Sequence, residues 1–322
     1  MAAAEKILVI QAGNIAEFVL SLAAMRKIRQ AHPRAHITLL TVPAFEALAR
    51  SSPYFNDIDT SGELLRSGGW LALRGRIKQA RFGRIYDLQG TAATNTLFQM
   101  LRPFPPVWSG PASGAKLRHR NPDRDRMHML ERHAEQLRVA GIWPDAPTTP
   151  GDAPGPDLSW ILRRAPAPRP IAGAVAPKPY VLLVPGGKDN APEKRWPIEG
   201  YSELAARLFA GGYDIVIIGG PQESALARTI QKRVGRARDL TGRTDFAQIA
   251  LVGAKAALAV GNDTGPLHLI AAAGAPTIGL FAGGPEALVS SPRGHVAVIH
   301  APDLASVAVD TVANAAFSLL PR

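Results

Sequence analysis

The chain has 322 residues, of which 46% are hydrophobic, and a mean hydropathy of +0.00; this composition is typical of a folded globular protein and excludes a disordered or membrane-spanning one. The net charge of +11 at pH 7 favours anionic partners such as phosphates, acidic glycolipids, a membrane surface or nucleic acid. The absence of cysteine excludes disulfides and thiolate metal sites, and at this length two domains are expected.

The first half of the chain alternates strand-like and helix-like segments. Residues 6–10 (KILVI) predict a strand, residues 16–32 a helix with apolar residues at helical spacing, and residues 36–42 a second strand. A strand, a helix and a strand in this order imply parallel pairing. Residues 44–51 continue as a helix, and residues 84–90 (RIYDLQG) predict a strand that ends in a polar turn.

The N-terminal apolar segment is too short for a signal peptide, and no apolar run reaches the roughly 18 residues of a membrane-spanning helix. We therefore expect a cytoplasmic protein. Residues 142–179 are so rich in Pro, Gly and Ala that they predict an interdomain linker around one short helix. The predicted division is a first domain at 1–150, a linker at 151–178 and a second domain at 179–322.

The alternation of strands and helices starts again after the linker. The predicted elements are strands at 180–187, 213–220, 256–262 and 276–281, and helices at 198–212, 222–235, 246–255 and 265–274. Two such halves predict an α/β protein with two Rossmann-like domains, whose parallel sheets face a central cleft. Ligands are then expected at the carboxyl ends of the strands.

A polar stretch, Asn262-Asp263-Thr264-Gly265, separates a predicted buried strand from a helix that starts near Gly265. Asp263 or Thr264 can cap this helix, and Gly265 leaves backbone amides open to a phosphate, which the positive end of the helix dipole favours. His268 lies one turn into the helix and faces the same end. A plain helix cap with nothing bound is the alternative.

A second candidate anion site follows the predicted strand at 180–187. Gly186 and Gly187 are followed by Lys188, Lys194 and Arg195 before the next helix. A glycine turn next to a cation suits a diphosphate, although a lysine in an exposed loop is more often only solvated. Because two such patterns occur at strand ends, a chance origin is less plausible than it would be for one pattern alone.

Several common enzyme motifs are absent from the sequence. No GxGxxG, Walker A or GxSxG motif occurs, so dinucleotide reduction, P-loop hydrolysis and α/β-hydrolase chemistry lose their usual signals. Glu17 stands where the first strand turns into its helix, and its carboxylate is expected to point toward the cleft. The alternative is an ordinary acidic residue at a helix start, which the dipole favours.

Taken together, these segments resemble glycosyltransferase family 9, the ADP-heptose:lipopolysaccharide heptosyltransferases, over nearly the full length. The resemblance rests on the order of the segments KILVIQAGNIAEFVLSLAAMRKIRQAHPRAHITLLT, YDLQG, VPGGKDNAPEKRWPIEGYSELA, IIGGPQE and DLTGRTDFAQIALVGAKAALAVGNDTGPLHLIAAAGAPTIGLF. It implies a GT-B fold and inverting transfer of a heptose from ADP-heptose to the lipid A–Kdo inner core. It implies no active-site metal and no cofactor beyond the ADP-sugar donor, an anionic glycolipid acceptor, and peripheral contact with the cytoplasmic face of the bacterial inner membrane.

The resemblance also implies roles for individual residues. Those that match the family's donor site, at the nucleotide diphosphate, the sugar and the ribose, are Gly186, Gly187, Lys194, Glu223, Asp263, Thr264, Gly265 and His268. The family reads Gly-Asp where this chain has Ala16-Glu17, so Glu17 takes the place of the base that activates the acceptor hydroxyl. Lys194 matches the lysine that contacts the phosphates. The chain also differs at FAGG (281–284), where the family reads FGPT, and at Ala23, where it has Pro.

The segment at 113–138 is dense in Arg, Lys and His. Lys116, Arg118 and Arg120 are expected to meet carboxylates or phosphates of the acceptor, or to hold the protein at anionic lipid. A solvated helix with acidic residues between the basic ones is the alternative.

Two other functions compete with this interpretation. One is a family relative that uses another nucleotide sugar or acceptor, and the other is a sugar-nucleotide-binding protein with weakened or lost transfer. Nucleic-acid binding is disfavoured, because the basic residues lack interleaved aromatic ones and only 6% of the chain is aromatic. The sequence does not specify the number of subunits.

Overall fold

The structure is a computed structural model that describes residues 4–164, 179–187, 192–284 and 288–320. Its internal contacts divide the chain into two units, Met1–Gly155 and Pro156–Arg322, and each is described by itself. Each unit contains one six-stranded sheet in which all strand pairs are parallel. None of the described helices is both long and apolar enough to cross a membrane.

The N-terminal unit has the strand order β3-β2-β1-β4-β5-β6. Its strands are β1 (Lys6–Ile10), β2 (His36–Leu40), β3 (Asp57–Asp59), β4 (Arg84–Asp87), β5 (Val107–Gly110) and β6 (Leu117–Arg118). Its helices are α1 (Ile15–Ala31), α2 (Glu46–Ser51), α3 (Trp70–Ala80), α4 (Ala92–Met100) and α5 (Met129–Val139), with short 3₁₀ helices at Pro43–Phe45, Ser61–Leu65 and Arg124–Arg126.

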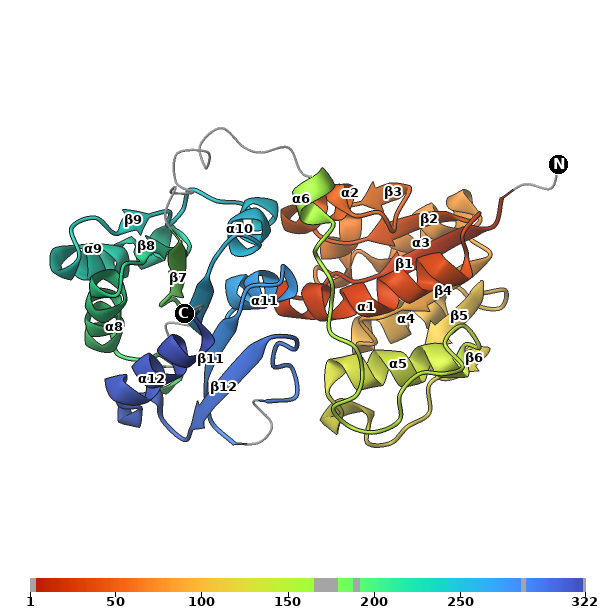
Figure 1. The fold of residues 1–322 in the computed structure, drawn as a ribbon. Coiled ribbons are helices and arrows are strands. Elements are labelled where there is room, and N and C mark those ends of the chain that lie inside the picture. The colour runs from red at the N-terminus through yellow and green to blue at the C-terminus, as the bar shows by residue number, and fades with distance from the viewer. Residues whose placement is uncertain (1–3, 165–178, 188–191, 285–287, 321–322) are drawn as a thin grey trace. The chain divides into compact units, whose positions relative to one another are not determined.

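Helices cover this sheet in two pairs: α1 packs against α5, and α3 packs against α4 (Figure 1). After its exposed first residue, Lys6, the strand β1 is apolar and buried. That pattern is expected for a central parallel strand with both faces covered. A small cluster of Leu20, Ala23, Met129, Leu130 and Ala153 fills the contact between α1 and α5.

The C-terminal unit has the strand order β12-β11-β10-β7-β8-β9. Its strands are β7 (Tyr180–Val184), β8 (Asp214–Ile217), β9 (Arg238–Asp239), β10 (Leu258–Asn262), β11 (Thr277–Ala282) and β12 (Val296–Ala301). Its helices are α6 (Ile161–Arg164), α8 (Ile198–Ala210), α9 (Ser224–Arg233), α10 (Phe246–Gly253), α11 (Gly265–Ala272) and α12 (Val309–Leu319), with 3₁₀ helices at Pro192–Lys194, Pro221–Glu223 and Leu304–Ser306.

In both units the order of strands along the chain reverses in the middle of the sheet. The reversal lies between β1 and β4 in the N-terminal unit and between β7 and β10 in the C-terminal unit. In open parallel sheets the connections on the two sides of such a point leave to opposite faces, so a crevice forms at the carboxyl ends of the two strands. Candidate site residues should therefore follow β1, β4, β7 and β10.

The predicted fold class, two Rossmann-like units with parallel sheets, is confirmed, and the cleft between them stays a prediction. The contact boundary after Gly155 falls inside the predicted linker. Residues 165–178 of that linker lie outside the described residues, and α6 is a short helix within it. The strand with a terminal polar turn predicted at 84–90 is present: β4 ends at Asp87, and the chain then turns through Gly90, whose φ is 60°.

Candidate functional site

The carboxyl ends of β7 and β10 lie next to each other in the C-terminal unit, because these two strands pair directly. Pro185 and Gly186 follow β7, and Asn262 is the last residue of β10. The buried side-chain amide of Asn262 donates from Nδ2 to the carbonyl oxygens of Pro185 and Gly186, at 3.0 Å each. The glycine turn after β7 is thus fixed to the end of β10.

The other end of the same amide holds the segment before α8. Asn262 Oδ1 accepts hydrogen bonds from the backbone N–H of Trp196 at 3.1 Å and from the hydroxyl of Tyr201 at 3.0 Å. The Trp196 ring packs edge-on against Tyr201 with ring centroids 4.9 Å apart, and its Nε1 donates to the carbonyl oxygen of Val307 at 2.8 Å. A Cβ at Gly200 would lie 2.8 Å from this ring, so Trp196 has a packing role.

The start of α11 lacks a side-chain cap. Thr264 occupies the N-cap position with extended backbone (φ −140°, ψ 156°), but its side chain makes no capping hydrogen bond, and its Oγ1 is buried without a partner among the described residues. The exposed Asp263 instead lies near His268, with Oδ1 and Nε2 3.4 Å apart. The structure therefore brings Asp263, Thr264, Gly265 and His268 together at a helix start where backbone N–H groups and the helix dipole favour an anion.

Glu223 lies against the glycine turn that follows β7. Its Oε2 accepts a hydrogen bond from the backbone N–H of Gly220 at 2.6 Å, and the residue is 6% exposed. A Cβ at Gly186 would lie 3.1 Å from the Glu223 carboxyl carbon, and one at Gly219 would lie 2.9 Å from its Cβ. The glutamate side chain therefore leaves little room for a side chain at either glycine, and Gly186 and Glu223 share one edge of the site.

The loop after Gly187 supplies the cationic residues of the predicted donor site. Lys188 lies outside the described residues. Lys194 ends the 3₁₀ helix Pro192–Lys194 and is exposed, and no contact in the described part of the chain ties its ammonium group to the start of α11. The neighbouring Arg195 donates from Nη2 to the carbonyl oxygen of Gly187. The position of Lys194 relative to a bound diphosphate stays a prediction.

In the N-terminal unit, Glu17 closes a capping box at the start of α1. Asn14 Oδ1 accepts from the backbone N–H of Glu17 at 2.9 Å, while Asn14 Nδ2 donates to Glu17 Oε1 at 2.9 Å and the Asn14 backbone N–H lies 3.3 Å from Oε2. The carboxylate folds back over Gly13, where a Cβ would lie only 1.8 Å from Oε2. Both carboxylate oxygens are thus oriented by the turn between β1 and α1.

That turn is held from three sides. Gln89, which follows β4, accepts from the backbone N–H of Ala12 at 3.0 Å, and Gln11 Oε1 accepts from that of Gly13 at 3.0 Å. Arg66 donates from Nη2 to the carbonyl oxygens of Ala12 and Gly13, at 2.8 Å each. Hydrogen bonds from three side chains therefore fix the turn that precedes Glu17.

A buried polar cluster follows β4 in the same unit. Burial raises the pKa of Asp87 to about 6, although the backbone N–H of Gly90 donates to its Oδ1 at 2.8 Å. His133 on α5 lies with Nε2 3.0 Å from the carbonyl oxygen of Leu88. Because a carbonyl only accepts, Nε2 carries the proton, and burial lowers the pKa of His133 to about 3. Gln136 donates to the carbonyl oxygens of Asp87 and Ser109, at 3.0 and 3.3 Å.

The basic segment at 113–138 differs from the continuous solvated helix that was its alternative interpretation. It forms β6, the 3₁₀ helix Arg124–Arg126 and only then α5, whose residues Met129, Leu130, Glu131 and His133 are buried. Lys116 and Arg120 are exposed, while Arg118 is half-buried and donates from Nε to the carbonyl oxygen of Pro111 at 3.2 Å. Their contact with an acceptor stays a prediction.

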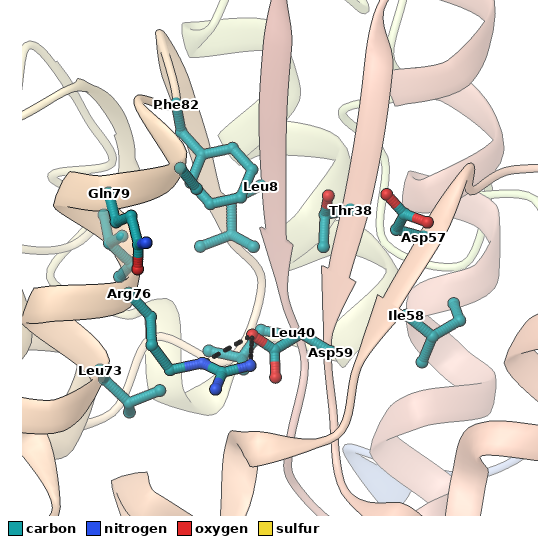
Figure 2. Close-up of a pocket in the computed structure, with 12 residues that line it drawn as sticks. Leu8, Thr38, Leu40, Asp57, Ile58, Asp59, Leu73, Arg76, Gln79 and Phe82 are labelled. Atoms are coloured by element: carbon teal, nitrogen blue, oxygen red, sulfur yellow. Dashed lines mark hydrogen bonds and ion pairs between the residues drawn. The ribbon is translucent and has the colours of Figure 1, made fainter.

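A cavity of about 430 Å³ lies elsewhere in this unit, between α3 and the face of the sheet formed by β1, β2 and β3. Figure 2 shows Arg76 reaching from α3 to Asp59, with Nη2 3.0 Å from Oδ2. Leu8, Leu40 and Leu73 form apolar parts of its lining. None of the predicted site residues lines this cavity, so we do not assign it to the site.

Three groups of functional candidates were not predicted as such. Asn262 belongs to the polar stretch singled out from the sequence, but its partners could not be read from the pattern. Asn14 was detectable, because an asparagine three residues before a glutamate at a helix start is the signature of a capping box. The buried cluster around Asp87 and His133 had no sequence signal beyond the motif YDLQG.

Comparison with solved structures identifies the fold. The heptosyltransferase II of E. coli that uses ADP-heptose superposes with a TM-score of 0.76 at 19% identity, covering 98% of both chains. A glycosyltransferase family 9 protein of Veillonella parvula gives 0.78 at 17% identity, covering 99% of this chain and 98% of that one. An E. coli heptosyltransferase with ADP-2-deoxy-2-fluoro heptose gives 0.75 at 20% identity, covering 97% and 99%. At these identities the likeness shows the shared GT-B fold.

Sequence comparison then identifies the family. A profile described as glycosyltransferase family 9 (heptosyltransferase) matches residues 70–299, and the chain belongs to this family. The lipopolysaccharide heptosyltransferase 2 proteins of Salmonella typhimurium and of E. coli K12 are each 31% identical over 109 residues. Those alignments cover 32% of this chain and 31% of each relative, so the chain matches about a third of the length of these curated relatives.

Asn262→Asp tests the amide that organises the C-terminal site. The variant keeps the acceptor for Trp196 and Tyr201 but puts a carboxylate oxygen against two carbonyl oxygens, so we expect a loss of about 3 kcal/mol of unfolding free energy at pH 8. The loss should shrink near pH 4, because a protonated carboxyl can donate one hydrogen bond. Urea unfolding measures both values, with exposed Asn314→Asp on α12 as the control within about 0.5 kcal/mol of the parent. An equal effect of the two substitutions would contradict the role assigned to Asn262.

His133→Gln tests the neutral buried histidine. The folded-state pKa of His133 is lowered to about 3, below the ordinary value of 6.5, so stability is fully present above pH 6.5 and is lost as pH falls toward 3. Glutamine can still donate to Leu88 but does not titrate. We expect the unfolding free energy of the parent to drop by about 3 kcal/mol more than that of the variant between pH 7 and pH 4.

Denaturant unfolding at the two pH values measures this difference. Exposed His295→Gln serves as the control, and it should follow the parent. The buried Asp87 contributes in the opposite direction, since its raised pKa of about 6 means stability lost as pH rises through that value. Its contribution is common to all three proteins and cancels. Parallel pH profiles for the parent and His133→Gln would show that the histidine titrates normally.

Proposed function

We propose that this chain is an inverting glycosyltransferase that moves a heptose from ADP-heptose to the lipopolysaccharide inner core, with lipid A–Kdo as acceptor. Its membership of glycosyltransferase family 9 and the names of its curated relatives support the proposal. The observation that carries it is the uncapped start of α11, held by Asn262 beside the glycine turn that follows β7. That arrangement suits a nucleotide diphosphate.

In this proposal the donor occupies the C-terminal unit. Backbone N–H groups at Thr264 and Gly265 meet diphosphate oxygens, and Gly186 allows close approach of the phosphates. Glu223, buried beside Gly186, accepts hydrogen bonds from the ribose hydroxyls. The ammonium group of Lys194 moves toward the diphosphate and stabilises the negative charge that develops on the diphosphate. No metal or cofactor takes part in the proposed reaction.

The acceptor occupies the N-terminal unit. Glu17 takes the proton of the acceptor hydroxyl while that oxygen bonds to the anomeric carbon from the face opposite the diphosphate. The bond from the anomeric carbon to the diphosphate oxygen breaks, its electron pair leaves with ADP, and the anomeric configuration inverts. Exposed Lys116 and Arg120, together with Arg118, meet the anionic glycolipid at the membrane surface.

One observation favours a second candidate function. Both carboxylate oxygens of Glu17 are already engaged by Asn14, and a glutamate replaces the aspartate expected from the family pattern. A misplacement of about 1 Å at a catalytic group can cost about 100-fold in rate. A nucleotide-sugar-binding protein with weakened transfer is therefore the alternative, alongside a transferase that uses another nucleotide sugar.

Donor binding and transfer are measured separately. Thermal unfolding is followed with ADP-heptose, ADP-glucose, GDP-mannose and ADP, and a ligand at 100 times its Kd stabilises the native state by about 2.7 kcal/mol. We expect ADP-heptose and ADP to raise the Tm and GDP-mannose not to. Transfer to lipid A–Kdo should then fall at least about 100-fold in Glu17→Gln with donor binding unchanged. Glu46→Gln, at the first turn of α2 in the same unit, is the matched control.

Each outcome separates the candidates. Because the ADP part alone should bind, ADP-glucose is expected to stabilise the protein less than ADP-heptose; a larger Tm shift with another nucleotide sugar than with ADP-heptose would replace the donor in the proposal. Stabilisation by ADP-heptose without product, together with product from Glu17→Asp, would identify a binding protein whose base has been displaced. If ADP raises the Tm of neither the parent nor Glu17→Gln, the donor site itself is misassigned.

A further inference from the structure

Two arginines of the N-terminal unit are largely buried and have few hydrogen-bond partners. The side chain of Arg124 is 9% exposed and that of Arg132 is 14% exposed. Arg124 donates from Nη1 to the carbonyl oxygen of Gly90 at 3.4 Å and to Asp125 at 3.1 Å, while its Nε and Nη2 are buried without a partner among the described residues. The Nε of Arg132 is likewise buried and unpartnered in that part of the chain.

The charges around the two guanidinium groups leave them undercompensated. Burial lowers the pKa of Arg132, and the neighbouring Arg124 lowers it further, while Asp125, Glu17 and Asp87 act in the opposite direction. Asp87 compensates them only in part, because its Oδ1 already accepts from the backbone N–H of Gly90 at 2.8 Å. Two buried cations in contact with so few acceptors cost folding free energy unless an anion joins them.

Asp125 is the residue that reaches both arginines. Its side chain is 87% exposed, yet Oδ1 lies 3.1 Å from Arg124 Nη1 and 3.9 Å from Arg132 Nη1. One exposed carboxylate oxygen is thus directed at two buried guanidinium groups. The nearby pair of Asp123 and Arg126 has the same residue types but is exposed on both sides (71% and 90%), with the atoms 3.8 Å apart. Of these two aspartates, Asp125 faces buried arginines, whereas Asp123 faces an exposed one.

We propose that Arg124 and Arg132 form a subsite for one oxyanion, a carboxylate or phosphate of the acceptor, and that Asp125 occupies the same place when no acceptor is bound. That the molecule carrying this oxyanion is the acceptor rests on the proposed transferase function. Guanidinium groups match both anions through paired N–H donors. The accessible edge of Arg132 makes the contact, and buried Arg124 strengthens it.

The location of the subsite gives it a role in positioning. Arg132 lies within electrostatic reach of both Glu17, after β1, and Asp87, after β4. These two strands are the neighbours at which the strand order of the sheet reverses. An oxyanion held by Arg132 would therefore fix an acceptor beside the glutamate. The subsite is made of residues other than Lys116, Arg118 and Arg120, although His119 in that segment lies within electrostatic reach of both arginines.

Asp125→Ala supplies the decisive test, because removing a carboxylate that competes for the site should tighten anion binding. The full chain, without donor, is titrated with inorganic phosphate and separately with gluconate, a sugar carboxylate, at constant ionic strength, and the Tm gives the Kd. We expect Asp125→Ala to lower the Kd of at least one anion by about threefold or more. Arg132→Met should raise that Kd by about tenfold or more.

The matched controls are Asp123→Ala and Arg126→Met. They alter the exposed ion pair whose members lie two residues before and one residue after Asp125 in the sequence. Both should bind the anions as the parent does. Phosphate also stabilises proteins by exclusion from their surface, but that part is common to every variant and does not saturate. If the variants change the Kd of phosphate alone, the acceptor presents a phosphate; if they change the Kd of gluconate alone, it presents a carboxylate.

The proposal is overturned if Asp125→Ala binds both anions no more tightly than Asp123→Ala. That surface variant removes no buried group, so the result does not depend on whether Arg132→Met folds. Saturable binding that is equal in all variants would mean that the two arginines are internal structural groups. Because no nucleotide sugar is present, loss of the proposed transferase function leaves this measurement unaffected, and its failure leaves the ADP-heptose result unaffected.

Discussion

The side-chain amide of Asn262 is the interaction on which the geometry of the C-terminal unit depends. Its two donor bonds hold the carbonyl oxygens of Pro185 and Gly186, and its oxygen accepts from Trp196 and Tyr201. An amide is suited to this role because it has donors on one side and an acceptor on the other. No aliphatic residue could satisfy four buried polar partners at once, so the identity of this side chain follows from what surrounds it.

Several consequences follow from this one group. Fixing the turn after β7 to the end of β10 sets the distance between Gly186 and the start of α11. The carboxyl group of Glu223 then fills the space that a side chain at Gly186 would need. The hydrogen bonds of Asn262 are themselves neutral and do not offset the positive end of the α11 dipole, although the carboxylate of Asp263 lies at the same helix start.

The features that the sequence revealed are those whose cause is local. The alternation of apolar strands and amphipathic helices, the helix start at Gly265 and the acid at Glu17 depend on residues within a few positions of one another. The edge strands β3, β6 and β9 have only two or three residues and no buried run, so nothing in their composition distinguishes them from loops. Helix α5 was hidden for another reason: His133 and Gln136 look solvated in sequence, but they satisfy carbonyl groups at the ends of β4 and β5.

The same division applies to the candidate site and explains how its two halves differ. The Asn14–Glu17 box spans three residues and can be read directly, whereas the bonds of Asn262 join residues 61 to 77 apart and exist only after the sheet has formed. In the C-terminal unit, the frame around Asn262 leaves backbone N–H groups for an anion, next to the carboxylates of Asp263 and Glu223. In the N-terminal unit, the corresponding edge gathers the ionisable groups Glu17, Asp87, Arg124 and Arg132; burial raises the pKa of Asp87 and lowers that of Arg132. In the proposed function, the start of α11 would bind the departing diphosphate, and the charged edge of the N-terminal unit would orient Glu17 against an anionic acceptor.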